Sequence, residues 1–170
     1  MVVALSRWHD SVRLARQILE RCGYLDTYRL RPRLDLAALL KQYGLAWHRR
    51  PFTNLAGALI QVDGAYHVVT NSRERSSRQR FSAAHELKHF LTDRHLADIF
   101  YCSRTSDRGI ERAANIFARE LLMPAETVRF LWERGFYGPE EIGRVLGVSF
   151  QAAAHRLEEV MTRQVRIRWE

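Results

Sequence analysis

Two runs of β-prone residues, at positions 58–62 and 65–70, are separated only by Asp63 and Gly64. An Asp-Gly pair readily adopts the positive φ angles that a two-residue turn between antiparallel strands requires. The sequence therefore predicts a β-hairpin, and a further short strand at 45–50 extends it to a small antiparallel sheet. Because segments with helical periodicity flank these strands on both sides, we expect a fold of the α+β class.

Helices are predicted from apolar residues at helical spacing and from residues that cap helix ends. Asp35 is the predicted N-cap of a helix that Gly44 ends, and Ser76 or Ser77 is the predicted cap of the helix after the hairpin. The predicted helices lie at 6–23, 35–44, 76–91 and 110–122, followed by a pair of short helices within 138–160, in which Pro139 takes a first-turn position and Ser149 a cap.

Length and composition fit one globular unit. The chain has 170 residues, of which 46% are hydrophobic, and this is enough to bury a core. We expect a single domain over residues 1–170. Within it we distinguish an N-terminal helical extension at 1–30, a core at 31–125 and a C-terminal helical segment resembling a helix-turn-helix at 126–170.

No stretch of the sequence reaches the roughly 18 apolar residues of a membrane span, and the first residues lack the pattern of a secretory leader. We therefore expect a cytoplasmic protein that does not engage a membrane. Cys22 and Cys102 form no CxxC pair, and we expect both to be reduced.

The net charge of +8 favours acidic partners or nucleic acid through long-range attraction. Arginine carries almost all of the excess, because Lys41 and Lys88 are the only lysines. A solvated basic surface is the preferred explanation of the charge, so charge alone does not identify a partner.

His85 and His89 lie four residues apart in the segment HELKH. On a helix, residues four apart differ by about 40° around the axis, so both imidazoles project from one face and suit one zinc ion. Glu86 lies about 100° further round, where its carboxylate can take a proton from an attacking water. A zinc peptidase needs both features, but HExxH also arises by chance in amphipathic helices, so a third ligand decides the case.

Two residues are candidates for that third ligand. His95 follows His89 by six residues, as in HExxHxxGxxH, but Thr92 stands where that pattern has glycine, and a β-branched residue disfavours positive φ. Glu111 lies on the predicted core-facing side of helix 110–122, where a carboxylate is costly unless it is paired or bound to a metal. An acidic residue in a first turn is also favoured by the helix dipole, so a purely local role for Glu111 stays open.

The predicted buried arc of helix 110–122 covers roughly 160° at about 100° per residue. It contains Phe117, Ile110, Leu121, Ala114, Ala118, Glu111, Leu122 and Asn115. The charged residues Arg112, Arg119 and Glu120 fall outside this arc, on the predicted solvent side.

Two longer motifs resemble the ImmA/IrrE metallopeptidases, which are zinc-dependent proteins of bacteria and their mobile elements. The segment RQRFSAAHELKHF is similar to the family pattern R-x-R-F-x-x-A-H-E-x-x-H, and ERAANIFARELLMP to E-x-x-A-N-x-F-A-x-x-L-L-M-P. The likeness extends more loosely over roughly residues 30 to 160. It implies a zincin-like fold of the gluzincin type, with a small antiparallel sheet, the HExxH helix, flanking helices and a C-terminal helical pair.

The resemblance also implies a site. One zinc ion per chain would be held by His85, His89 and Glu111, with Glu86 as the general base. Asn115 follows Glu111 by one helical turn and could orient it, as residues around metal ligands do.

Other positions match or depart from the family pattern. Arg78 and Arg80 match the family's arginines, and they could steady the helix entry, hold a substrate carbonyl or lie in a solvated first turn. Lys88 stands where the family commonly has glycine, and its stem must snorkel past the core. Thr92 and Asp93 replace an apolar-then-histidine ending, so the shape of the pocket could differ.

The resemblance further implies cleavage, in the cytoplasm, of a helix-turn-helix transcriptional repressor, often encoded nearby, which relieves repression. The alternative is a DNA-binding or scaffold regulator with a structural or vestigial zinc site. Within 138–160 the second helix offers mainly Gln151 and His155 to a DNA groove, so a packing unit or a substrate dock is the preferred interpretation. His67 and Tyr101 are candidate electrophilic helpers, although ordinary packing explains both.

Overall fold

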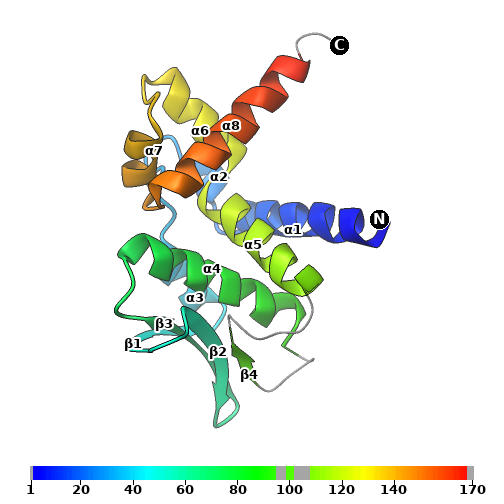
Figure 1. Ribbon diagram of the computed structural model, residues 1–170, viewed down its shortest axis with the longest axis vertical. Coiled ribbons are helices and arrows are strands. Elements are labelled where there is room, and N and C mark those ends of the chain that lie inside the picture. Colours follow the sequence, from blue (N-terminus) through cyan, green and yellow to red (C-terminus); the bar gives the residue numbers. More distant parts are fainter. Residues whose placement is uncertain (1, 95–98, 102–107, 168–170) are drawn as a thin grey trace.

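The computed structural model describes residues 2–94, 99–101 and 108–167, and Figure 1 shows how its helices and strands are arranged. In chain order the elements are α1 (Val2–Arg21), α2 (Tyr24–Thr27), α3 (Leu36–Gln42), β1 (Ala46–Arg50), β2 (Gly57–Val62), β3 (Ala65–Asn71), α4 (Ser76–Thr92), β4 (Ile99–Tyr101), α5 (Arg108–Leu122), α6 (Ala125–Glu133), α7 (Pro139–Leu146) and α8 (Phe150–Ile167). Within the described ranges, no helix is both long and apolar enough to cross a membrane.

The predicted hairpin is confirmed. Strands β2 and β3 pair antiparallel, and the turn between them uses Asp63 at φ 49° and Gly64 at φ 79°. Both angles lie in the left-handed region that this turn type requires, which aspartate and glycine tolerate better than most residues.

The sheet is mixed rather than antiparallel as predicted. Its strand order is β1-β3-β2-β4, with β2 antiparallel to both β3 and β4. Strand β1 instead runs parallel to β3, with Trp47 beside Val68. The connection at 51–56 reverses the chain, so β2 runs opposite to β1, and β3 lies between these two strands. Because β3 is antiparallel to β2, it runs in the same direction as β1.

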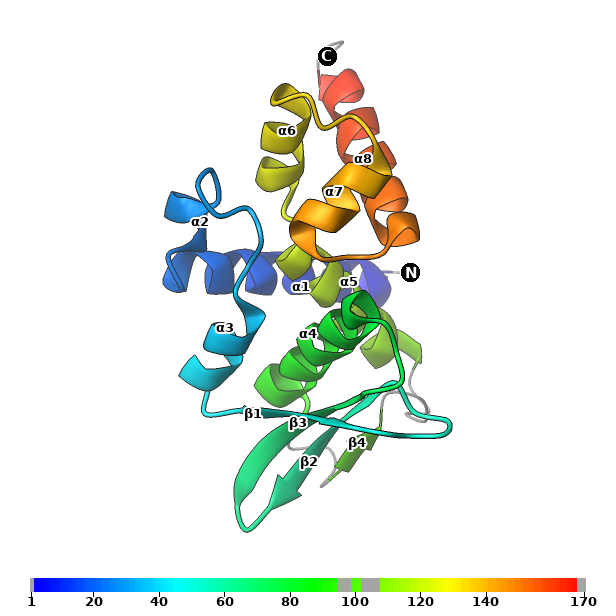
Figure 2. The same cartoon turned by 90° about the vertical axis from the view of Figure 1, so that its left-hand side faces the viewer.

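The helices form layers above one face of the sheet (Figures 1 and 2). Helix α4 packs on β2 and β3, α5 packs on α4, and α1 packs on α5. Helices α6, α7 and α8 form a group on the side of α5 away from the sheet. Helix α4 therefore lies between the sheet and α5, where side chains from both can meet it.

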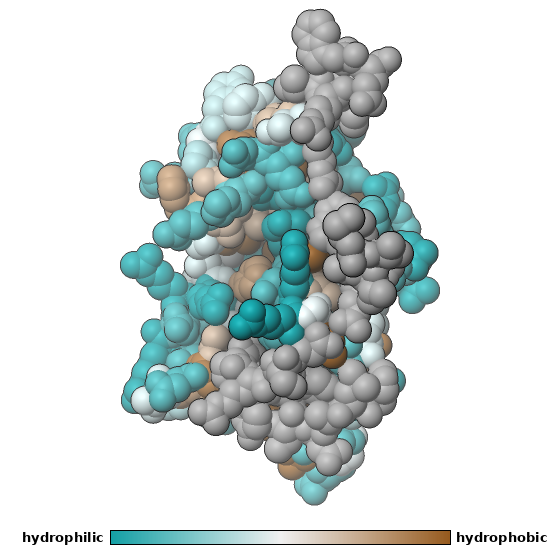
Figure 3. All heavy atoms as spheres, turned by 45° about the vertical axis from the view of Figure 1, so that its right-hand side comes forward, coloured by the Kyte–Doolittle hydropathy of each residue, from teal (hydrophilic) through white to brown (hydrophobic). Residues whose placement is uncertain are grey.

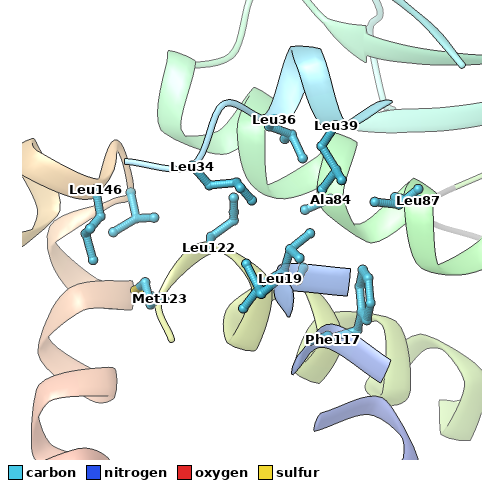
Figure 4. Packing of buried hydrophobic residues seen from close by; sticks show 14 of the residues in the cluster. Leu19, Leu34, Leu36, Leu39, Ala84, Leu87, Phe117, Leu122, Met123 and Leu146 are labelled. Carbon is cyan, nitrogen blue, oxygen red and sulfur yellow. The ribbon is translucent and has the colours of Figure 1, made fainter. Parts of the chain in front are cut away.

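The core is one contiguous cluster of buried apolar residues that extends from α1 to α8. Figure 4 shows side chains of α1, α3, α4 and α5 converging at its centre. The residues there include Leu19, Leu36, Ala84, Leu87, Phe117 and Leu122. Large exposed apolar side chains are few among the described residues, namely Leu30, Val62, Tyr137 and Phe150. Hydrophilic side chains accordingly predominate among the coloured residues in Figure 3.

One predicted helix cap is observed and another is not. The Asp35 carboxylate accepts a hydrogen bond from the Ala38 amide at 3.0 Å, and Gly44 follows α3 at φ 72°. The predicted Ser76 or Ser77 cap is wrong, because the N-cap of α4 is Arg75, which makes no side-chain cap. Ser76 already has helical geometry there.

The C-terminal helices were predicted in outline. Pro139 begins α7, and the Ser149 hydroxyl accepts a hydrogen bond from the Ala152 amide at 3.2 Å. Helix α8 spans 18 residues and is not short as predicted, because apolar residues such as Val160 continue to pack on the core. Helix α6 was not predicted, although its Thr127, Val128 and Leu131 are buried.

Glu120 was placed on the solvent side of α5, and this prediction is wrong. Its side chain is buried against α8, where Arg156 forms a two-pronged ion pair with its carboxylate. Arg156 also donates to the Met123 carbonyl at 2.8 Å and to the Glu159 carboxylate at 3.0 Å. A wheel of one helix cannot detect this arrangement, since the neutralising charge comes from another helix.

Candidate metal centre

Helix α4 brings His85 and His89 together on the side that faces α5. Both imidazoles are buried, and their Nε2 atoms lie 2.9 Å apart. Residues one turn apart on the same face of a straight helix produce this arrangement without any unusual backbone. The two Nε2 atoms therefore face a common position.

Helix α5 contributes Glu111 from its first turn. One carboxylate oxygen, Oε2, lies 3.2 Å from His85 Nε2, and the other, Oε1, lies 3.4 Å from His89 Nε2. Ligand atoms of these three residues lie within 4.8 Å of one another. In a tetrahedral zinc site with bonds of roughly 2.0–2.1 Å, ligand atoms are about 3.3 Å apart. The separations of 2.9, 3.2 and 3.4 Å therefore fit a zinc ion.

The other nitrogen of each imidazole faces an oxygen acceptor. His85 Nδ1 lies 3.0 Å from the amide oxygen of Asn115, and His89 Nδ1 lies 2.9 Å from a carboxylate oxygen of Asp93. A carboxylate can only accept, so Nδ1 of His89 carries a proton, which turns Nε2 toward the shared position. Asn115 thus supports the orientation of His85 through this contact, and its predicted role in orienting Glu111 stays a prediction.

Glu86 is fully buried between α4 and strand β2. A Cβ atom at Gly57 would lie 3.5 Å from Oε1 of Glu86 and only 3.1 Å from Cβ of Ser82. Glycine at position 57 thus lets the strand run close to the helix at this carboxylate. The sequence patterns singled out Glu86 but not Gly57, because an isolated glycine at the start of a strand carries no distinctive signal.

The profile of the IrrE N-terminal-like domain, a peptidase family, matches residues 40–158 of the chain. The chain belongs to this family. It is also similar to two proteins named radiation response metalloprotease IrrE, from Deinococcus deserti and Deinococcus radiodurans. The identities are 39% over 114 residues and 32% over 112 residues, covering 58% and 57% of this chain. The matched part spans only 40% and 34% of the lengths of these relatives.

Lys88 and Asp93, which depart from the ImmA/IrrE pattern, contact each other beside the candidate ligands. The Lys88 ammonium donates to Asp93 Oδ2 at 2.7 Å, the same oxygen that accepts from His89. The Thr92 hydroxyl donates to the other carboxylate oxygen at 3.0 Å. Lys88 was predicted to snorkel past the core, but its ammonium stays buried because Asp93 provides a countercharge. Asp93 follows His89 by four residues, the same helical spacing as the two histidines, and that signal could have predicted the contact.

Electrostatic interactions beside the candidate ligands couple His89 to its acidic neighbours. Burial acts to lower the pKa of His89, but hydrogen bonds to Asp93 and Glu111 and the nearby charges of Glu86 and Glu111 outweigh it, raising the pKa to about 9. Burial likewise acts to raise the pKa of Asp93, and the hydrogen bonds from His89, Lys88 and Thr92 outweigh it and lower that pKa. Without a metal, His89 is therefore protonated at neutral pH.

The two predicted arginines lie outside the centre. Arg80 is buried and donates from Nη2 to the Leu34 carbonyl at 3.0 Å, tying α4 to the segment before α3. Burial, with a smaller contribution from the charge of Arg33, lowers the pKa of Arg80 to about 10. The Arg78 guanidinium lies 5.9 Å from the centre of the Phe81 ring, near the start of α4.

The remaining candidates are not brought to the centre by any described contact. His67 on β3 hydrogen-bonds His48 on β1, with 3.1 Å between Nδ1 and Nε2. Tyr101 belongs to β4, where its backbone pairs with Ala58, but its side chain lies outside what the structure describes. His95, the alternative third ligand, also lies outside the described residues.

Proposed function

We propose that this chain is a zinc-dependent endopeptidase of the ImmA/IrrE family. The observation that carries the proposal is the convergence of His85, His89 and Glu111, with separations of 2.9 to 3.4 Å between their facing atoms. Two histidines and one carboxylate are a ligand set that catalytic zinc uses, with a fourth position left for water or substrate. The two Deinococcus relatives are named metalloproteases, which supports the same chemistry.

Each residue has a distinct task in this proposal. When bound, zinc lowers the pKa of a water molecule and polarises the carbonyl of the scissile bond. His85, His89 and Glu111 hold the ion. Glu86, about 100° from His85 around α4, takes the proton from the attacking water and passes it to the leaving amine. Removing that carboxylate should therefore abolish turnover while the three ligands stay in place.

We further propose that the substrate is a helix-turn-helix transcriptional repressor encoded nearby, on a mobile genetic element or in its host. Cleavage of that repressor in the cytoplasm would relieve repression and regulate transcription. This part of the proposal depends on the resemblance to the ImmA/IrrE family, because no geometry in the centre selects a particular protein.

The second candidate is a DNA-binding or scaffold regulator whose zinc is structural. Its support is the geometry of α7, a tight turn at Gly147 with φ 71°, and α8, which together resemble a helix-turn-helix. The exposed face of α8, however, presents Gln151, His155 and Glu158, while its Arg156 is buried in an ion pair. Among the α8 side chains that the structure describes, up to Thr162, the exposed ones include an acidic residue and no arginine. Such a face is poorly suited to DNA, so the peptidase is preferred.

The test is co-expression of the chain with the repressor-like gene nearest to its own, followed by intact mass spectrometry of both proteins. We expect the repressor to be cut once by the native chain and to remain whole with Glu86→Gln, which keeps the zinc ligands. Equal cutting by both forms would contradict the assigned mechanism. An intact repressor with native, zinc-loaded protein would contradict the proposed substrate, and salt-dependent binding of duplex DNA would then favour the second candidate.

A further inference from the structure

A pocket of ≈ 480 Å³ lies between the first turns of α4 and α8. Its lining includes Arg75, the N-cap of α4, together with Arg78 and Phe81 of α4. On the other side it includes Val148, Gln151 and Ala152 of the α7–α8 turn and α8. Figure 2 shows that turn facing the beginning of α4, and Figure 1 shows the same arrangement from the side. The volume falls in the range of about 300–1,000 Å³ that is usual for ligand sites.

The pocket lies on the same face of α4 as the candidate metal centre. At about 100° per residue, Arg78 and Phe81 lie within roughly 40° of His85 around the helix axis. At about 1.5 Å per residue, they precede His85 by roughly 10 Å and 6 Å along that axis. A chain that follows this face from the centre therefore reaches the pocket after two or three extended residues, at about 3.3 Å each.

Helix α5 provides a solvent-facing path in the same direction. Glu111 is partly exposed, and Asn115, one turn later, is exposed while it contacts His85. One turn further, Arg119 Nη1 lies 3.5 Å from a carboxylate oxygen of Glu159 on α8. The accessible side of the centre thus continues along α5 toward the helix that closes the pocket.

We propose that this pocket is a substrate subsite that binds a large apolar side chain two or three residues from the scissile bond. The inference rests on the proposed peptidase function and adds a specificity to it. Phe81, Val148 and Ala152 form an apolar wall, with Phe81 half-buried and available for contact. A leucine, methionine or aromatic side chain fits such a wall through burial of apolar surface.

Charge at the rim selects the neighbouring residue of the substrate. Arg75 and Arg78 line the pocket together with a single acidic residue, Glu74. The guanidinium of Arg78 lies 5.9 Å from the centre of the Phe81 ring, so its positive charge stands beside the apolar wall. The subsite therefore favours an acidic residue next to the apolar one and disfavours a basic residue there.

The test uses zinc-loaded protein and a library of proteome-derived peptides, with cut positions read by mass spectrometry. Native protein should enrich Leu, Met, Phe or Trp at one position two or three residues from the cut, with acidic residues beside it. Ala152→Phe fills the pocket and should reduce that enrichment at least about tenfold in favour of small residues, since pockets discriminate by size to this degree. Arg78→Glu should replace the acidic preference by a basic one.

The matched control is Ala154→Phe, the same change on α8 at a residue that does not line the pocket. It should keep the native preference, and zinc content and thermal unfolding should be compared across all variants. Cutting by native protein without this preference, or an unchanged preference in both Ala152→Phe and Arg78→Glu, would overturn the subsite while leaving the peptidase intact. Absence of any cutting by native, zinc-loaded protein would overturn the proposed function and the subsite with it.

Discussion

Lys88 and Asp93 form a buried ion pair, and the same Asp93 oxygen also contacts His89, a candidate metal ligand. Asp93 Oδ2 accepts from both Lys88 Nζ at 2.7 Å and His89 Nδ1 at 2.9 Å. A carboxylate buried among helices needs such neutralisation, and a carboxylate behind an imidazole fixes the orientation of that ring. The two departures from the family pattern thus act together, because each buried charge is a partner of the other.

Two double variants separate the hydrogen bond from the charge. Lys88→Met with Asp93→Asn keeps an acceptor for His89 without a buried unpaired charge, whereas Lys88→Met with Asp93→Leu removes the acceptor. We expect the zinc dissociation constant to stay close to native in the first and to rise about 10–100-fold in the second. Competition with a fluorescent chelator measures both values. Equal affinity in the two variants would mean that Asp93 does not orient His89.

Zinc affinity should depend on pH through His89. Its pKa is raised to about 9 in the metal-free protein, so protonation of His89 stabilises the metal-free fold below about pH 6.5, and this stabilisation is lost as pH rises through 9. Zinc must displace that proton. We expect the apparent affinity to rise by about tenfold per pH unit between pH 7 and 8.5, measured by the same chelator competition. A flat profile over this range would contradict a protonated His89.

Among the elements, α8 is held to α5 by one buried arginine. Arg156 reaches both oxygens of Glu120 and the Met123 carbonyl, and its side chain is almost fully inaccessible. Loss of one partner of such a pair leaves the other charge buried and uncompensated, which is more damaging than loss of both. The C-terminal helical group therefore depends on this contact for its position on the core.

Arg156→Met should lower the free energy of unfolding by about 3–5 kcal/mol, because Glu120 would remain buried without its partner. Adding Glu120→Leu should restore a large part of the loss. Chemical denaturation followed by circular dichroism measures each variant. If Arg156→Met alone unfolds like the native chain, the pair contributes little and α8 is held by apolar packing.

Local chemistry made several elements predictable from the sequence. Asp63 and Gly64 specify the hairpin turn, Asp35 and Gly44 bound α3, and the spacing within α4 aligns two histidines. Each of these features depends on residues that lie in the same turn or the same helix, so a short stretch of sequence is enough to predict it.

Contacts between distant segments were not predictable in the same way. The parallel pairing of β1 with β3 follows from a strand inserted between two others, which no local pattern encodes. Glu120 and Arg156 are 36 positions apart, so an isolated wheel assigns Glu120 to solvent. Glu111 was predictable only in part. The periodicity of α5 placed it on the core-facing side, but its approach to His85 depends on the packing of α5 on α4.

At the scale of the whole molecule, the candidate centre lies where the layers meet. Helix α4 is packed between the sheet and α5, and α1 covers α5 from the other side. The core that supports them continues without interruption to α8. The match to the IrrE N-terminal-like family runs from residue 40, near the end of α3, to residue 158, within α8. The part of the chain that holds the candidate site is therefore the part shared with that family.

The central claim is that His85, His89 and Glu111 together bind one zinc ion, and native mass spectrometry of zinc-loaded protein tests it most directly. Glu111→Gln removes a ligand, and Glu86→Gln makes the same chemical change beside the site without removing one. We predict one zinc ion per chain in the native protein and in Glu86→Gln, and no retained zinc in Glu111→Gln under the same conditions. Equal zinc retention in Glu111→Gln and the native protein would contradict the account.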